Sequence, residues 1–187
     1  VDDDTDWTLS PDDNGVQWAV DATPASVPGG AFNSSPASLN FNNGVDYDNG
    51  DDAEGSAQLT AAFDLTGIID PSLTFACNYE TESANKTSAD KRLLEFSFDD
   101  FSSVFTSLQL ATNGSEIDDC AAMGTWHTHT VTPPTASTSL SIRWSFDSAD
   151  EFANGNAGWF IDDIALQSSA TTVGFSSPHE AFTVADD

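Results

Sequence analysis

The chain has 187 residues with 31 acidic and only 4 basic side chains, a formal net charge of -27. The length is ample for one domain with a core, and 39% hydrophobic content with 13 Phe and 5 Trp excludes a disordered acidic chain. Four cations cannot neutralise a phosphate backbone or an anionic bilayer, which excludes nucleic-acid and membrane-surface partners. No apolar run reaches the roughly 20 residues of a membrane-spanning helix.

The predicted strands follow from period-2 alternation of apolar residues, and sustained helical spacing is missing. Frequent Gly, Pro and Asn residues separate these segments, which favours an antiparallel sandwich or barrel of about nine strands. The segments are, in chain order, 16–20, 39–41, 59–65, 73–79, 93–98, 104–110, 126–131, 140–146 and 160–166. We expect long acidic loops over 42–55 and 81–90, and a turn over 68–71.

Both ends of the chain lie outside this sandwich, which we place at residues 15–168. Residues 1–14 form an acidic N-terminal arm, and residues 169–187 form a C-terminal arm or an additional strand. The chain begins with Val1-Asp2-Asp3-Asp4 and shows no signal peptide, so we interpret it as a mature, processed secreted chain.

The composition points to an extracellular or cell-surface location. A strongly acidic composition with almost no lysine is typical of proteins that function at high salt concentration, where charge repulsion is screened. Ordinary secreted surface proteins are also acidic, however. Cys77 and Cys120 are an even count, which predicts one disulfide in an oxidising compartment; two buried thiols are the alternative. Sequons predict glycosylation at Asn33, Asn85 and Asn113, but a chain so rich in Asn, Ser and Thr also produces sequons by chance.

The most specific segment runs from residue 126 to 166 and contains LSIRWSFDSAD followed by GWFIDDIAL. It resembles the MAM-like jelly-roll domains of secreted bacterial metallopeptidases of the immune-inhibitor-A type and of bacterial surface proteins. SLNFNNGVDYDNG, FDLTGIIDPSLTFACNYETE and KRLLEFSFDDF fit the family's upstream pattern in order. The resemblance implies a two-sheet jelly-roll β-sandwich that serves as a binding, adhesive or stabilising module, often with structural calcium. No HExxH is present, so the protease portion of such proteins is missing.

Two adjacent carboxylates in GWFIDDIAL are the first candidate ion site. On a regular strand, Asp162 and Asp163 face opposite sides, each between large apolar neighbours, where an ionised carboxylate needs a partner. Calcium is one possible partner and Arg143 is another. The remaining alternative is a bulge that turns one carboxylate outward while backbone N–H groups satisfy the other.

Two further sets of acids are candidate calcium ligands. Asp46, Asp48 and Asp51 lie in an alternating acidic segment with Asn-Gly, which can wrap a calcium ion but departs from EF-hand spacing. The alternative is a solvated hairpin loop that uses Asn-Gly as turn chemistry. The second set, Glu80, Glu82 and Asp90, comes from the region of the chain that the resemblance covers.

Catalytic constellations are absent from the sequence, so we expect no enzyme activity. The sequence contains no nucleophile elbow, phosphate loop or C-x-x-C. His127 and His129 share one face of a strand, and a third ligand would complete a zinc site. No neighbour in sequence supplies that ligand, so we expect both histidines on a solvent-facing surface.

Two functions fit these features. The first is a non-catalytic surface protein, stabilised by calcium, that self-associates into a filament, sheath or layer as its arms add strands to neighbouring subunits. The second is a carbohydrate-binding or adhesion module that uses exposed aromatic residues. The candidate glycan contacts are Trp7, Trp18, Trp126 and Tyr47, for which core packing is the alternative.

Overall fold

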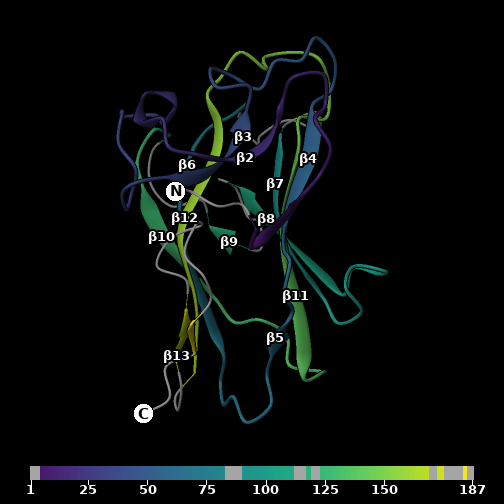
Figure 1. The fold of residues 1–187 in the computed structure, drawn as a ribbon. Helices are drawn as coiled ribbons and strands as arrows, with labels where there is room; N and C mark the ends of the chain where they lie inside the picture. The colour runs from purple at the N-terminus through teal and green to yellow at the C-terminus, as the bar shows by residue number, and fades with distance from the viewer. Residues whose placement is uncertain are drawn as a thin grey trace.

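Two β-sheets pack face to face in the computed structural model, which describes residues 5–82, 90–111, 117–118, 123–168, 172–174 and 183–184 (Figure 1). The described residues form 14 strands and one short 3-10 turn, η1 (Pro24–Ser26). All described strand pairs are antiparallel except β8 with β9. The predicted antiparallel β-sandwich is therefore confirmed. No described helix is long and apolar enough to cross a membrane.

The first sheet has the order β1-β4-β11-β7-β8-β9, and β5 pairs with β11. Its strands are β1 (Trp7–Leu9), β4 (Glu54–Leu59), β5 (Phe63–Asp64), β7 (Lys91–Ser97), β8 (Thr106–Ala111), β9 (Ile117–Asp118) and β11 (Ser139–Asp147). The long strand β11 lies between β4 and β7, so this sheet is organised around it.

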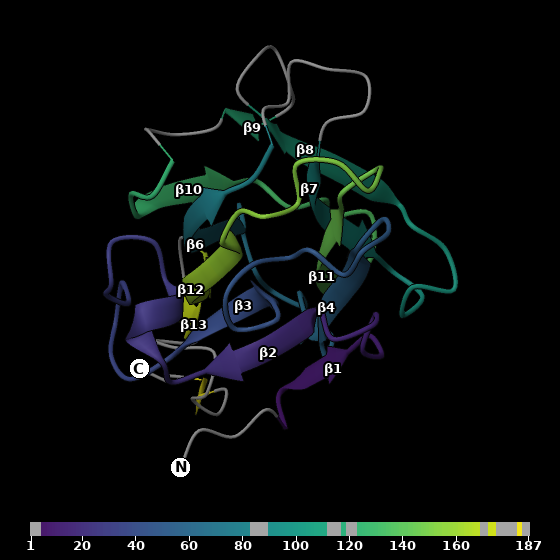
Figure 2. The same ribbon diagram turned by 90° about the horizontal axis from the view of Figure 1, so that it is seen from above.

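The second sheet is organised around β12, which pairs with β6 along one side and with β3 and then β13 along the other. Edge strand β10 pairs with β6, and β2 pairs with β3. The strands are β2 (Gln17–Asp21), β3 (Ser38–Asn42), β6 (Ser72–Glu80), β10 (His127–Val131), β12 (Gly158–Gln167), β13 (Thr172–Gly174) and β14 (Thr183–Val184). Figure 2 shows the two layers from above.

Large aromatic side chains fill the space between the sheets. The predicted row Leu140, Ile142, Trp144 and Phe146 is fully or almost fully buried and faces the second sheet. Ring contacts join the layers: the centroids of Phe41 and Phe146 are 4.8 Å apart. Burying each such side chain contributes on the order of 2 kcal/mol, which opposes the repulsion among the excess acidic groups.

The predicted acidic loop over 42–55 is shorter than expected because β4 begins at Glu54. The strand sequence EGSAQL lacks β-branched and aromatic residues, so propensity gives no signal for it. Tertiary packing decides the conformation here: a Cβ at Gly55 would lie 2.7 Å from Cε2 of Phe41. The small residue lets a core aromatic approach the strand backbone.

Described parts of both terminal arms pair within the chain itself. Strand β1, from the N-terminal arm, pairs with β4 through Trp7↔Leu59 and Leu9↔Ala57. From the C-terminal arm, β13 pairs with β12, and β14 pairs with β13. The expected strand-like arms are therefore present, and their described strands extend the chain's own sheets.

Gly158 provides a test of the close approach between β12 and β3. Its φ is +102°, and a Cβ there would lie 2.1 Å from the backbone oxygen of Phe41, which cannot move aside cheaply. We expect Gly158→Ala to lower the free energy of unfolding by more than about 3 kcal/mol, measured by urea denaturation. Gly50→Ala is the matched control, because Gly50 also has a positive φ (+84°) but open space around it, and it should lose only about 1–2 kcal/mol. Equal losses in the two variants would contradict this packing.

Candidate functional site

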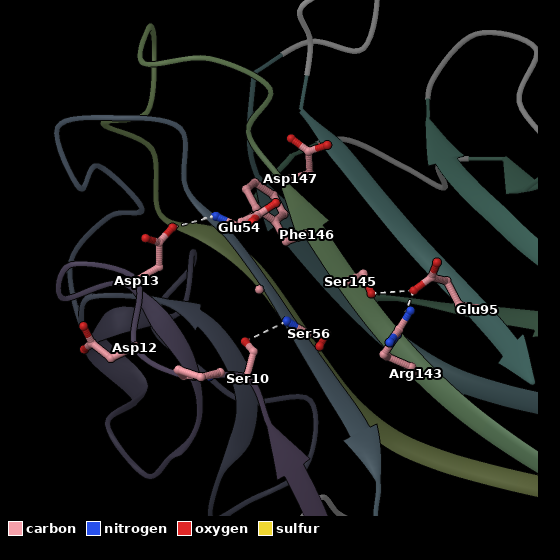
Figure 3. A pocket seen from close by; sticks show the side chains of 12 residues that line it. Ser10, Asp12, Asp13, Glu54, Ser56, Glu95, Arg143, Ser145, Phe146 and Asp147 are labelled. Carbon is pink, nitrogen blue, oxygen red and sulfur yellow. Dashed lines mark hydrogen bonds and ion pairs between the residues drawn. The ribbon is translucent and has the colours of Figure 1, made fainter. Parts of the chain in front are cut away.

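A polar pocket of about 510 Å³ lies on the outer face of the first sheet (Figure 3). Strands β4, β11 and β7 form its floor, and the segment after β1 forms a wall. The register places outward-facing residues in rows across these strands: Glu54 lies opposite Asp147, Ser56 opposite Ser145, and Arg143 opposite Glu95. The principal polar residues around the pocket are Asp12, Asp13, Glu54, Ser56, Glu95, Arg143, Ser145 and Asp147.

Glu95 is the most buried acid of the pocket, at 7% exposure. One of its oxygens accepts hydrogen bonds from Nε of Arg143 at 2.9 Å and from the Ser145 hydroxyl at 2.6 Å. The guanidinium group of Arg143 also lies 4.1 Å from the ring centroid of Phe101. These contacts hold the Arg143 and Glu95 side chains in fixed positions on the pocket floor, as a preorganised binding surface requires.

Three of the other four pocket carboxylates have partners within the protein. Asp12 accepts from the backbone N–H of Gly15 at 2.7 Å, and Asp13 accepts from the backbone N–H of Glu54 at 2.9 Å. Asp147 forms an ion pair with Lys91 at 2.6 Å. The pocket is still acidic overall, because five acids and one arginine line it. Such a surface repels anions and offers many acceptors to ligand hydroxyl groups.

The predicted aromatic glycan contacts are wrong for three of the four residues. Trp7, Trp18 and Tyr47 are buried in the core, at 7%, 1% and 0% exposure. Their packing explains this: the ring centroids of Trp18 and Trp159 are 5.4 Å apart, and those of Tyr47 and Phe146 are 5.1 Å apart. Only Trp126 is partly exposed, and its Nε1 donates to the backbone oxygen of Ala31 at 2.8 Å.

The Asp162–Asp163 pair lies in a β-bulge of β12, between the part paired with β3 and the part paired with β13. Trp159 and Ile161 before the bulge, and Ile164 after it, all join the core, so the strict alternation expected for this strand is wrong. Asp163, with a φ of 48°, turns outward and accepts from Asn33 Nδ2 at 2.5 Å.

Neutral donors satisfy Asp162, which is fully buried. It accepts hydrogen bonds from the backbone N–H of Ser34 at 2.7 Å, from the Ser34 hydroxyl at 3.1 Å and from the N–H of Asp163 at 2.8 Å. Burial raises the pKa of Asp162 to about 6, although these hydrogen bonds oppose the shift. The bulge alternative therefore describes this site, and pairing with Arg143 is wrong because Arg143 contacts Glu95. Calcium binding at these acids stays a prediction.

The acidic segment from residue 43 to 52 forms a series of Asx turns. Asp46 accepts from the backbone N–H of Asp48 at 3.2 Å, Asp48 from that of Gly50 at 2.9 Å, and Asn49 from that of Asp51 at 2.9 Å. Asp48 and Asp51 are exposed. These contacts fit the solvated turn better than a calcium loop, although they leave calcium binding untested.

The third predicted ligand set divides between the protein interior and the surface. Asp90 is buried at 2% exposure and accepts hydrogen bonds from the Tyr47 hydroxyl and the backbone N–H of Glu82. Burial raises the pKa of Asp90 to about 6. Glu80 and Glu82 are half-buried. Asp90 thus anchors the buried Tyr47 ring to the strand connection, and its ligand role stays a prediction.

The expected solvent-facing position is wrong for His129, which is 4% exposed, while His127 is half-buried on the same strand face. His127 and His129 point between the sheets, beside Cys77 of β6. Sequence reasoning missed this thiol because it is about 50 residues away, and only strand pairing brings it near. Cys120 lies outside the described residues, so the disulfide stays a prediction. Among the sequons, Asn85 and Asn113 are also outside them, and the exposed Asn33 contacts Asp163.

The raised pKa of Asp162 predicts a pH dependence of stability. The folded protein holds the Asp162 proton to a higher pH than the unfolded chain does. The contribution of this proton to the free energy of unfolding therefore falls as the pH rises from about 4 to about 6. Asp162→Asn removes this titration. We expect the melting temperature of the wild type, relative to the variant, to be higher at pH 4 than at pH 7. The control Asp48→Asn removes one exposed carboxylate. If the difference in melting temperature between the wild type and Asp162→Asn stayed constant with pH, that result would contradict this environment for Asp162.

Comparison with known proteins identifies no family. No protein-family model matches the chain, and no curated protein matches it. The structure is similar to the enzymatically active domain of tailspike protein 4 from bacteriophage CBA120, with 13% identity and a TM-score of 0.48. That match covers 89% of this chain but 20% of the tailspike chain.

Two further similar structures match over most of their own length. One is a CBM27-1 module of Caldicellulosiruptor saccharolyticus in complex with mannohexaose, with 12% identity, a TM-score of 0.44 and coverage of 85% and 88% of the two chains. The other is the K3 cleaved adhesin domain of Lys-gingipain from Porphyromonas gingivalis, with 16% identity, a TM-score of 0.42 and coverage of 88% and 92%. At these values the similarities carry no statement about activity, and the MAM-like resemblance stays a prediction.

Proposed function

We propose that this chain is a non-catalytic, secreted carbohydrate-binding module that binds a neutral oligosaccharide in the pocket on the outer face of the first sheet. The observation that supports it is the fixed polar floor formed by Arg143, Glu95 and Ser145. Sugar hydroxyls both donate and accept hydrogen bonds, and this floor offers carboxylate acceptors beside guanidinium and hydroxyl donors.

The charge of the pocket selects a neutral ligand. Anionic sugars are disfavoured because five acids surround a single lining cation. Asp13, Glu95 and Asp147 already accept from protein donors, so they need no cationic ligand to offset their charge. Their remaining lone pairs suit hydroxyl donors, which bind without removing an ion from water.

Hydrogen bonds, more than aromatic stacking, carry recognition in this proposal. Phe146 is the aromatic residue that lines the pocket, and it is only 1% exposed. Binding is therefore expected to be modest, because hydroxyl groups and pocket atoms both give up water contacts when they pair. Phe101 is half-buried and stacks on Arg143, so it stabilises the pocket from the side.

Self-association through the arms is the other function expected from the sequence. The described strands of both arms pair within the same chain, as β1 on β4 and β13 on β12. Within the described residues, this pairing needs no neighbouring subunit. The polymer therefore stays a prediction, and the pocket is the feature that we propose as functional.

A filled pocket tests this function. Ser56→Trp places a large side chain on the pocket floor and leaves Arg143 and Glu95 themselves unchanged. Screening the wild type on an array of neutral and acidic oligosaccharides should identify a neutral ligand. Calorimetry with that ligand should then show at least a tenfold loss of affinity, about 1.4 kcal/mol, for Ser56→Trp.

Thr130→Trp is the matched control, because Thr130 is an exposed strand residue of the other sheet. This variant should bind like the wild type. Unchanged binding by Ser56→Trp would move the site elsewhere on the molecule. Failure of the wild type to bind any neutral glycan, or a preference for acidic ones, would contradict the proposal itself.

A further inference from the structure

Cys77, His127 and His129 bring three metal-binding side chains together between the sheets. Strand β10 pairs with β6 at the edge of the second sheet, with His127 opposite Cys77 and His129 opposite Phe75 (Figure 1). Alternation along the strands turns these side chains to the same inner face. The Cys77 sulfur and one ligand nitrogen of each histidine all lie within 4.8 Å of one another.

The two sulfur–nitrogen distances match two ligand–ligand edges of a tetrahedral metal site. The Cys77 Sγ lies 3.2 Å from Nε2 of His127 and 3.4 Å from Nε2 of His129. In tetrahedral zinc coordination, bond lengths of about 2.3 Å to sulfur and about 2.0 Å to nitrogen place neighbouring S and N ligand atoms about 3.5 Å apart. The two imidazole planes cross at 83°, so the rings approach the thiol from different directions.

The second nitrogen of His127 gives an independent indication of a ligand role. Its Nδ1 lies 3.0 Å from the backbone oxygen of Thr125. A carbonyl oxygen only accepts hydrogen bonds, so Nδ1 carries the proton and Nε2 of the neutral ring presents a lone pair toward Cys77. Histidines that bind metals are typically oriented in this way by a carbonyl or carboxylate partner.

The surroundings suit a borderline metal such as zinc. Cys77 is fully buried and His129 is 4% exposed, and the Phe75 ring packs against His129 with centroids 5.1 Å apart. His127 is only half-buried, so an ion can reach the site from the side of β10. A thiolate and two neutral imidazoles leave a bound Zn²⁺ with one net positive charge, which the overall charge of -27 favours.

We propose that Cys77, His127 and His129 bind Zn²⁺ as three ligands of a tetrahedral site. Binding releases the thiol proton to solvent, and the three side chains occupy three of the four coordination positions. The ion ties edge strand β10 to β6, so zinc also stabilises that edge. This site is separate from the pocket on the first sheet, and each proposal stands or fails independently of the other.

Two other states of Cys77 are the alternatives. Without a metal, the thiol donates to Nε2 of His127 while Nε2–H of His129 donates to the sulfur, which satisfies all three groups by hydrogen bonds. In an oxidised protein, the predicted disulfide with Cys120 removes the thiolate. The metal site and that disulfide are mutually exclusive.

Cobalt titration of the reduced, metal-free full chain distinguishes these states. A tetrahedral Co²⁺ site with a thiolate ligand should give visible d–d bands and a near-ultraviolet thiolate-to-cobalt band, both removed by excess Zn²⁺. Cys77→Ser should abolish the thiolate band, and His127→Ala should weaken Co²⁺ binding at least tenfold. Circular dichroism checks folding, and half-buried His127 provides the variant less prone to misfold.

Two controls isolate the proposed ligands. His179→Ala removes the third histidine of the chain, and Cys120→Ser removes the other cysteine; both variants should bind Co²⁺ like the wild type. Zn²⁺ should also raise the melting temperature of the wild type but not that of His127→Ala. Absence of the thiolate band in the wild type, its survival in Cys77→Ser, or a Cys77–Cys120 disulfide in the natively purified protein would overturn the proposal.

Discussion

Scarcity of positive charge is the constraint on which the rest of this structure depends. Four cations accompany 31 carboxylates, so most acids must be held by neutral donors or left in water. Buried Asp162 is held by N–H and hydroxyl groups of Ser34, and buried Asp90 by the Tyr47 hydroxyl. In the acidic loop before β4, carboxylates accept hydrogen bonds from backbone N–H groups of the same loop. Neutral donors offset only part of the burial penalty, which is why the pKa of both buried acids rises to about 6.

The same constraint separates the two proposed sites. On the first sheet, Arg143 fixes Glu95 on the floor of an acidic pocket, which leaves acceptors for uncharged hydroxyl ligands. In the second sheet, the metal site uses a thiol and two imidazoles instead of the abundant carboxylates. Large aromatics occupy the space between the sheets, so aromatic residues contribute to stability more than to ligand contact. Fold and recognition thus rely on different residue types.

The sequence predicted the sandwich well because alternation is a local property: the rows of β6 and β11 follow from residue order alone. The predicted strand over 59–65 is wrong as one element, because β4 ends at Leu59 and β5 contains only Phe63 and Asp64. The rest of β4 was not predicted, because Gly55 is a strand residue through its close contact with a distant aromatic residue, Phe41. The bulge at Asp163 changes which side of the sheet the following residues face, and no residue type in the sequence predicts that change. Pairing of strands that are distant in sequence likewise places Cys77 beside the histidines and Glu95 beside Arg143. Neither arrangement could therefore be predicted from the order of residues alone.

The place where a glycan binds is the most direct test of the proposed function. A ¹⁵N–¹H correlation spectrum, recorded during titration with the neutral oligosaccharide selected by the array, reports on each backbone amide. We predict that shifts concentrate at Glu54, Ser56 and Ser145 on the floor of the pocket. Shifts confined to the second sheet, or no shifts at saturating ligand, would contradict a binding site on β4, β11 and β7.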